Sequence, residues 1–187
     1  MGKAVFTPDQ RCWRFYADAA SPSTPLANED VKPTLTDSSI IRLRIALGET
    51  GDANGSFPWR LEYSLDDSAW NSFGAAQHWD YANGADTEGN ADSILLSDAD
   101  TAGVYIESDA YSTQLGKSTI EDFDWAIVPT GSVTADQTYY FRVLYDDGGY
   151  TAVTLEGTNI HPQVLTAAAA GGFQSAWAVN SNPGVIQ

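Results

Sequence analysis

Apolar and polar residues alternate with a period of two in several stretches of this chain. Residues 39–47 show the pattern clearly: aliphatic residues fall on one face, whereas Arg42 and Arg44 fall on the other. Such alternation is typical of a β-strand with one face in a core and the other toward water. The pattern recurs over residues 11–17, 59–65, 119–128 and 138–145, with shorter candidates over 70–73 and 150–155.

The chain shows almost no helical periodicity, and short polar turns separate the expected strands. Asp66-Asp67-Ser68 and Asp146-Asp147-Gly148-Gly149 have the residue types that tight turns favour. The sequence therefore predicts an all-β fold, an antiparallel β-sandwich. Its expected core consists of Ile41, Leu43, Ile45, Trp59, Leu61, Tyr63, Trp125, Tyr139, Phe141 and Val143.

The pattern divides the chain into a body and appendages. Residues 1–10 form an expected N-terminal arm, and residues 11–166 form the sandwich domain. Within it, residues 74–102 are acidic and rich in Asn and Gly, and we expect a long insertion that protrudes into solvent. Residues 167–187 are the C-terminal assembly arm.

The C-terminal arm combines small residues with large apolar ones and has no charged side chain. Disordered tails are usually charged and poor in aromatic residues, so this segment needs a surface to lie on. That surface is either its own domain or a neighbouring subunit, and we expect a neighbour. Residues 167–172 would act as a flexible joint, and the expected contacts are Phe173, Trp177, Val179, Val185 and Ile186.

Charge limits the classes of partner. The formal net charge is −16, and no Lys or Arg occurs between Arg60 and Lys117. Such a field repels phosphate, so we expect no nucleic-acid binding. The acidic surface is either a solvated outer face or a patch for cations or a basic partner. No apolar run is long enough to span a membrane, and the N-terminus lacks the apolar segment of a signal peptide, so we expect synthesis in a cytoplasm.

The residues of common catalytic and metal motifs are missing. Cys12 is the only cysteine, and His78 and His161 are the only histidines. We find no nucleophile elbow, zinc motif or phosphate loop, so we expect no enzyme, catalytic residue, cofactor or metal. Two acidic loops leave a calcium site open as an alternative to ordinary turns; they contain Glu49, Asp52 and Asn54, and Asp98 and Asp100.

Two aromatic residues next to His78 are candidate glycan contacts. Trp79 and Tyr81 lie in an expected loop, where an exposed ring would stack on the apolar side of a sugar. The alternative is that both rings cap the end of the core.

Two stretches resemble fibronectin type III and related immunoglobulin-like modules. Residues 59–70, WRLEYSLDDSAW, are similar to their strand-turn-strand with Tyr-Ser and a following Trp. Residues 138–143, TYYFRV, are similar to the strand that opens with a corner tyrosine. The resemblance implies that the hydroxyl of Tyr139 returns to nearby backbone.

The ending resembles the finish of structural proteins from tailed bacteriophages. Residues 173–182, FQSAWAVNSN, are similar to their pattern of an aromatic residue followed by Ala-Trp-Ala and two asparagines. The resemblance implies a non-enzymatic component on the virion surface, either a capsid decoration or cement protein or a tail accessory protein. Its partners would be capsid or tail subunits and further copies of itself.

Two other functions stay open at this point. One is a carbohydrate-binding or host-adhesion module that contacts a host surface glycan. The other is an accessory domain of an enzyme.

Overall fold

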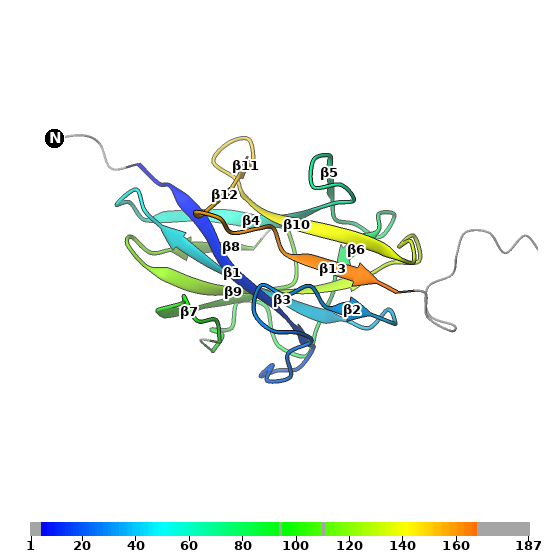
Figure 1. The fold of residues 1–187 in the computed structure, drawn as a ribbon. Coiled ribbons are helices and arrows are strands. Elements are labelled where there is room, and N and C mark those ends of the chain that lie inside the picture. The colour runs from blue at the N-terminus through cyan, green and yellow to red at the C-terminus, as the bar shows by residue number, and fades with distance from the viewer. Residues whose placement is uncertain (1–4, 94, 110, 168–187) are drawn as a thin grey trace, which may run out of the picture.

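The computed structural model of the chain describes residues 5–93, 95–109 and 111–167. This part is all-β, with thirteen strands and no helix, and its strands form two sheets (Figure 1). Most strand pairs are antiparallel, but three are parallel, so both sheets are mixed. The all-β prediction is confirmed, and the two sheets are consistent with a β-sandwich.

Sheet A has the order β12-β1-β3-β9-β6, with β7 also paired to β9. The two short strands share one edge of β9, because β6 pairs with its end and β7 with its beginning. The bounds are β12 (Thr154–Leu155), β1 (Pro8–Ala17), β3 (Ile41–Glu49), β9 (Ile120–Pro129), β6 (Trp79–Tyr81) and β7 (Thr101–Ile106).

Sheet B has the order β2-β13-β10-β4-β5, with β11 paired to β10 and β8 paired to the first part of β4. The turn between β10 and β11 contains Gly148 at a φ of 110°, a conformation that glycine adopts easily. The bounds are β2 (Thr34–Leu35), β13 (Gln163–Thr166), β10 (Gln137–Tyr145), β4 (Gly55–Ser64), β5 (Trp70–Ser72), β11 (Thr151–Ala152) and β8 (Ser112–Leu115).

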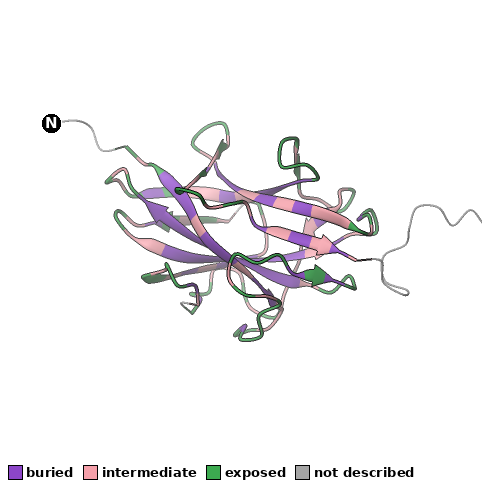
Figure 2. Ribbon diagram, viewed as in Figure 1, coloured by how far each residue is buried: buried purple, intermediate pink, exposed green. Residues whose placement is uncertain are grey.

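The core lies between the sheets, and the ten residues named as the expected core in the sequence analysis all belong to one buried cluster. Trp59 on β4 and Trp125 on β9 are both fully buried. Each ring contacts Phe123, with centroids 5.3 and 6.0 Å apart. Burial runs along the long strands of both sheets (Figure 2). Period-two alternation therefore identified the core positions correctly.

Three details differ from the sequence prediction. β1 begins at Pro8, so part of the expected N-terminal arm is strand. Leu65, expected in the core, follows the end of β4 and is 41% exposed. The strand expected over residues 150–155 is divided between the sheets: β11 pairs with β10, and β12 pairs with β1.

The acidic segment also differs from the expected protruding loop. It contributes β6 to the edge of sheet A, and its later part lies against the outer face of that sheet. Leu96 is buried there in a small cluster with Cys12 on β1 and Ala46 on β3. Exposed and buried residues are mixed along the segment. Its buried residues include both an apolar one, Leu96, and a charged one, Asp92, and both contact sheet A.

Candidate functional site

Five charged side chains on the outer face of sheet A form a buried ion network. Arg42 and Arg44 come from β3, and Asp122 and Asp124 come from β9. Asp92 comes from the acidic segment between β6 and β7, called the covering segment below because it lies over the outer face of sheet A. The first four are completely buried, and Asp92 is 7% exposed. Ionised groups in a protein interior need close partners of opposite charge, and the network supplies them.

Asp92 and Asp124 each contact both guanidinium groups. Asp124 Oδ2 lies 2.8 Å from Arg42 Nη2 and 2.6 Å from Arg44 Nη2. Asp92 Oδ2 lies 3.3 and 2.6 Å from the same two nitrogens. The Arg42 guanidinium also stacks on the ring of Tyr105, 3.9 Å from its centroid.

Three carboxyls against two guanidiniums leave the network short of positive charge. Burial, followed by the hydrogen bond with Asp92, raises the pKa of Asp124 to about 7. Burial acts to raise the pKa of Asp92 as well, but the hydrogen bond with Asp124 and the charge of Arg44 outweigh it and lower the pKa. The two carboxyls therefore share a proton that is retained to near neutral pH.

The network fastens the covering segment to sheet A. Asp122 Oδ2 accepts hydrogen bonds from the backbone N–H of Leu95 and Leu96 at 2.6 and 3.1 Å. Arg44 donates a hydrogen bond to the carbonyl of Ser93. Since the charged groups are covered and bound to one another, this cluster has a structural role.

Sequence reasoning missed the network because it assigned Arg42 and Arg44 to a water-facing side. The pairing of β3 with β9 brings the charged residues together: Arg44 lies directly opposite Asp124, and Ala46 lies opposite Asp122. Two arginines two residues apart on one strand and two aspartates two residues apart on its neighbour indicate paired charges.

The two candidate glycan contacts are not loop residues with free rings. Trp79 lies in β6 and is fully buried, with its ring edge-on to Phe141 at a centroid distance of 5.0 Å. The Tyr81 hydroxyl accepts a hydrogen bond from the Leu61 backbone N–H at 2.7 Å. Burial raises the pKa of Tyr81 well above its ordinary value. For Trp79 the structure agrees with the alternative that the ring belongs to the core, and only the expected loop is wrong, because β6 pairs with β9.

The two histidines contact a tyrosine hydroxyl and a carboxylate. His78 Nδ1 lies 2.8 Å from the Tyr139 hydroxyl, which also accepts a hydrogen bond from the Thr134 backbone N–H at 2.9 Å. His161 Nδ1 lies 2.6 Å from Asp67 Oδ1. In the described residues, neither histidine hydrogen bonds to a Ser, Thr or Cys side chain.

The acidic loops considered for calcium bind backbone amides and a lysine. Glu49 accepts hydrogen bonds from the N–H groups of Thr7 and Gly51 at 3.1 and 2.7 Å. Asp52 lies 2.6 Å from Lys117 Nζ. No group of three or more His, Cys, Asp or Glu in the described residues is arranged to hold a metal ion. Nor does any described segment form a helix of the length and apolarity that crossing a bilayer requires.

The outer face of sheet B carries a row of three charged side chains with an aromatic ring at each end. Glu62 lies between Arg60 and Arg142, with nearest contacts of 3.3 and 2.6 Å. The guanidinium of Arg60 lies 3.5 Å from the centroid of Tyr150, and that of Arg142 lies 4.6 Å from the centroid of Trp70. Within this row, each of these rings already has a guanidinium against one face.

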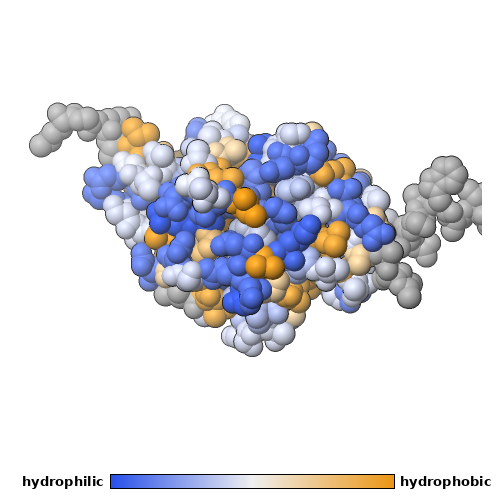
Figure 3. Space-filling model, viewed as in Figure 1, coloured by the Kyte–Doolittle hydropathy of each residue, from blue (hydrophilic) through white to orange (hydrophobic). Residues whose placement is uncertain are grey.

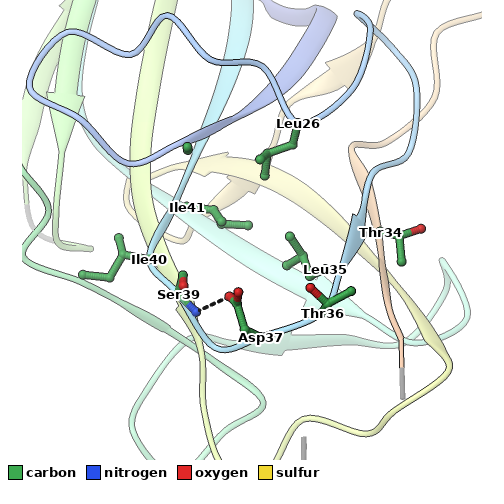
Figure 4. A pocket seen from close by; sticks show the side chains of 9 residues that line it. Leu26, Thr34, Leu35, Thr36, Asp37, Ser39, Ile40 and Ile41 are labelled. Atoms are coloured by element: carbon green, nitrogen blue, oxygen red, sulfur yellow. Dashed lines mark hydrogen bonds between the residues drawn. The ribbon is translucent and has the colours of Figure 1, made fainter. Parts of the chain in front are cut away.

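A pocket of about 250 Å³ lies next to β2 (Figure 4). Leu35 and Ile41 belong to the core, and Leu26, which is 36% exposed, lies across from them. One rim is a turn in which the Ser39 backbone N–H donates to Asp37 Oδ1 at 2.9 Å. The complete lining is Ala17, Leu26, Thr34, Leu35, Thr36, Asp37, Ser39, Ile40 and Ile41.

The described chain ends beside this pocket. β13 runs parallel to β2, and the backbone N–H of Ala167 donates to the carbonyl of Leu35 at 2.8 Å. Leu35 is part of the pocket lining, so the C-terminal arm starts at the pocket wall. The expected arm contacts Phe173, Trp177, Val179, Val185 and Ile186 lie outside the described residues.

Comparison of the chain with models of known protein families, with curated proteins and with solved structures finds no match.

Proposed function

We propose that this chain is a non-enzymatic structural component of a bacteriophage virion, located on the particle surface as a capsid decoration or tail accessory protein. The two-sheet domain is its rigid body, and residues 167–187 attach it to capsid or tail subunits or to further copies. The proposal rests on the phage-like sequence of residues 173–182 and on the place where β13 ends.

The observation that carries the proposal is the place where the described chain ends. Among the described residues, the core cluster contains residues from both sheets, and its last member along the chain is Val164. β13 already has β10 and β2 as neighbours. Ala167, the last described residue, bonds to Leu35 at the end of β2, and strand β13 can be followed to this point in Figure 1. The apolar residues that the sequence places after it are the proposed contacts with a neighbour.

The order of strands supports an immunoglobulin or fibronectin III type of sandwich as the rigid body. Seven strands in chain order, β1, β3, β4, β6, β9, β10 and β13, take the places of strands A to G. Sheet A then has the order A-B-E-D, and sheet B has the order G-F-C. Trp59 is buried on the third of these strands, and the hydroxyl of Tyr139 on the sixth accepts a hydrogen bond from backbone five residues upstream. Both are hallmarks of that type.

The state of the charged groups supports a scaffold role over catalysis. The most perturbed carboxyl, Asp124, is completely buried in the network on sheet A and has no path to a substrate there. Strongly shifted groups mark active sites only when they also line a cleft. The alternative glycan-binding role depended on free rings at Trp79 and Tyr81, and their packing removes that support.

Incorporation into particles tests the proposal. Virions produced with the unmodified chain should contain it in fixed stoichiometry, whereas deletion of residues 168–187 or the pair Phe173→Ala and Trp177→Ala should abolish incorporation. A matched control, Gln174→Ala with Ser175→Ala, changes the same segment without removing an aromatic side chain and should be incorporated normally. Normal incorporation of the double aromatic variant, or absence of the unmodified chain from particles, would refute the proposal.

A further inference from the structure

The pocket beside β2 has the size and lining of a binding site for one aromatic side chain. Its volume is about 250 Å³, and an aliphatic cavity of about 150 Å³ is enough to bind benzene. Leu26, Leu35 and Ile41 face the space between them (Figure 4). Threonine, serine and aspartate residues form the rim, so the pocket is apolar inside and polar at its mouth.

The apolar character of this pocket is local. On the face shown in Figure 3, hydrophobic residues form small separate patches among hydrophilic ones. Among the described residues, the exposed large apolar side chains are Val5, Leu26, Val31, Leu65 and Ile160. Leu26 is the one of these five that lines the pocket. A ligand that buries Leu26 would therefore remove one of the few large apolar side chains left in contact with water.

The described chain ends beside this pocket, and the sequence that follows contains aromatic residues. Because β13 and β2 are parallel, the chain at Ala167 runs in the same direction as Thr36 and Asp37 on the pocket rim. Phe173 is six residues further on, within about 20 Å of Ala167 at full extension. Gly171 and Gly172 precede it and allow the chain to reverse.

We propose that, before assembly, this pocket holds an aromatic side chain of the protein's own C-terminal arm, with Phe173 as the first candidate. The inference rests on the proposed function, since it assigns a resting position to the same attachment arm. A short tether gives the arm a local concentration of the order of millimolar at its own pocket. The arm has no charged side chain, so the net charge of −16 on the whole chain does not repel it. Assembly onto a particle then requires that the arm leave this pocket for a neighbouring subunit.

A cysteine pair in the full-length chain tests the docked position. Ser39→Cys lies on the pocket rim, and Gln174→Cys lies next to Phe173. The natural Cys12 is buried, and burial raises the pKa of its thiol to about 12, so it does not compete in disulfide formation. Mild oxidation should give an intramolecular disulfide in a monomer. The matched control replaces Ser39→Cys with Ser56→Cys on β4, where no cross-link with Gln174→Cys should form.

A charge in the pocket provides a second, independent readout. Leu26→Asp should release the ring, and chymotrypsin should then cleave after Phe173 at least tenfold faster than in the unmodified chain. Val31 lies with Leu26 in the connection between β1 and β2, is 49% exposed and does not line the pocket. The cleavage rate of the Val31→Asp chain should therefore stay unchanged. Equal cleavage rates for all three chains would overturn the inference.

The cross-linking result separates this inference from the proposed function. Disulfide-linked dimers would mean that the arm of a second copy fills the pocket. A yield of intramolecular disulfide no higher than that of the Ser56→Cys control would mean that the pocket does not bind the arm. Either outcome overturns docking in the same chain. Arm-dependent incorporation into virions would survive both outcomes. Conversely, a monomeric cross-link in a protein absent from virions would refute the proposed function and leave the docked arm intact.

Discussion

Asp124 is buried between two arginines on the outer side of sheet A, and its environment makes the stability of the protein depend on pH. Burial, followed by the hydrogen bond with Asp92, raises its pKa from 3.8 to about 7. The groups that face it are Arg42, Arg44 and Asp92. A carboxyl with a higher pKa in the folded state holds its proton more tightly there, so protonation favours folding.

The contribution of Asp124 to stability is therefore complete below about pH 4 and is lost as the pH rises through about 7. Between these values the free energy of unfolding should fall by up to about 1.4 kcal/mol per pH unit. Asp124→Asn cannot ionise and should flatten this part of the curve. Urea unfolding at several pH values measures the difference between the two chains. Asp98→Asn, at an exposed acid, should keep the unmodified slope; an Asp124→Asn curve parallel to the unmodified one would contradict the assignment.

The same residues show what the sequence could reveal at this scale. Ile41, Leu43 and Trp125 were placed in the core correctly, because an apolar residue on a strand face has no other stable location. Arg42 and Arg44 were placed toward water, because an isolated arginine is rarely buried. Their burial depends on Asp92, a residue about fifty positions away, and its arrival over β3 follows from the tertiary fold.

At the scale of elements, the segment between β6 and β7 has few buried side chains among its described residues, although backbone hydrogen bonds also join it to β7 and β9. Its buried anchors are Asp92 and Leu96, and the N–H groups of Leu95 and Leu96 bond to Asp122. Much of the rest is exposed. Segments with few buried contacts open locally at lower free energy than the core strands.

Asp122→Ala should therefore release this segment without unfolding the sandwich. Hydrogen exchange at the amides of Leu95 and Leu96 should accelerate at least tenfold, because both lose their acceptor. Exchange in β4 and β10 should change much less. Asp100→Ala, an exposed acid of the same segment, is the control and should leave all these rates unchanged. Equal acceleration in β4 and β10 would show that the network is needed for the whole domain.

The strand pattern predicted the long elements but not all of their partners. Residues 41–49 and 120–129 have an alternation that fixes which face is apolar, and this accounts for β3 and β9. The division of residues 150–155 between sheets depends on where β10 and β1 lie in space. Similarly, Trp79 reads as a loop residue, because β6 is only three residues long and gains its strand identity from β9.

At the scale of the whole molecule, the described residues form two sheets around one main core. The last core residue among them is Val164, and the last described backbone hydrogen bond is that of Ala167 with Leu35. The sequence predicts an assembly arm from residue 167, because charge and alternation both stop near it, and nearly all of that arm lies outside the described residues. It did not predict the pocket at the exit, because Leu26 and Leu35 approach Ile41 only after the connection between β1 and β3 has folded.

Deletion of residues 168–187 should leave a domain that unfolds in one cooperative transition, since all thirteen strands of the described residues are kept. One docked aromatic ring is worth about 1.5–3 kcal/mol before the entropy of closing its tether. For a domain of this size, the melting temperature should therefore fall by about 2–6 °C. Leu26→Asp in the full-length chain should lower it by a similar amount, and the two changes combined should add little, because both remove the same contact. Loss of the cooperative transition on truncation would instead make the arm a part of the sandwich, and full additivity would mean that the arm and the pocket act independently.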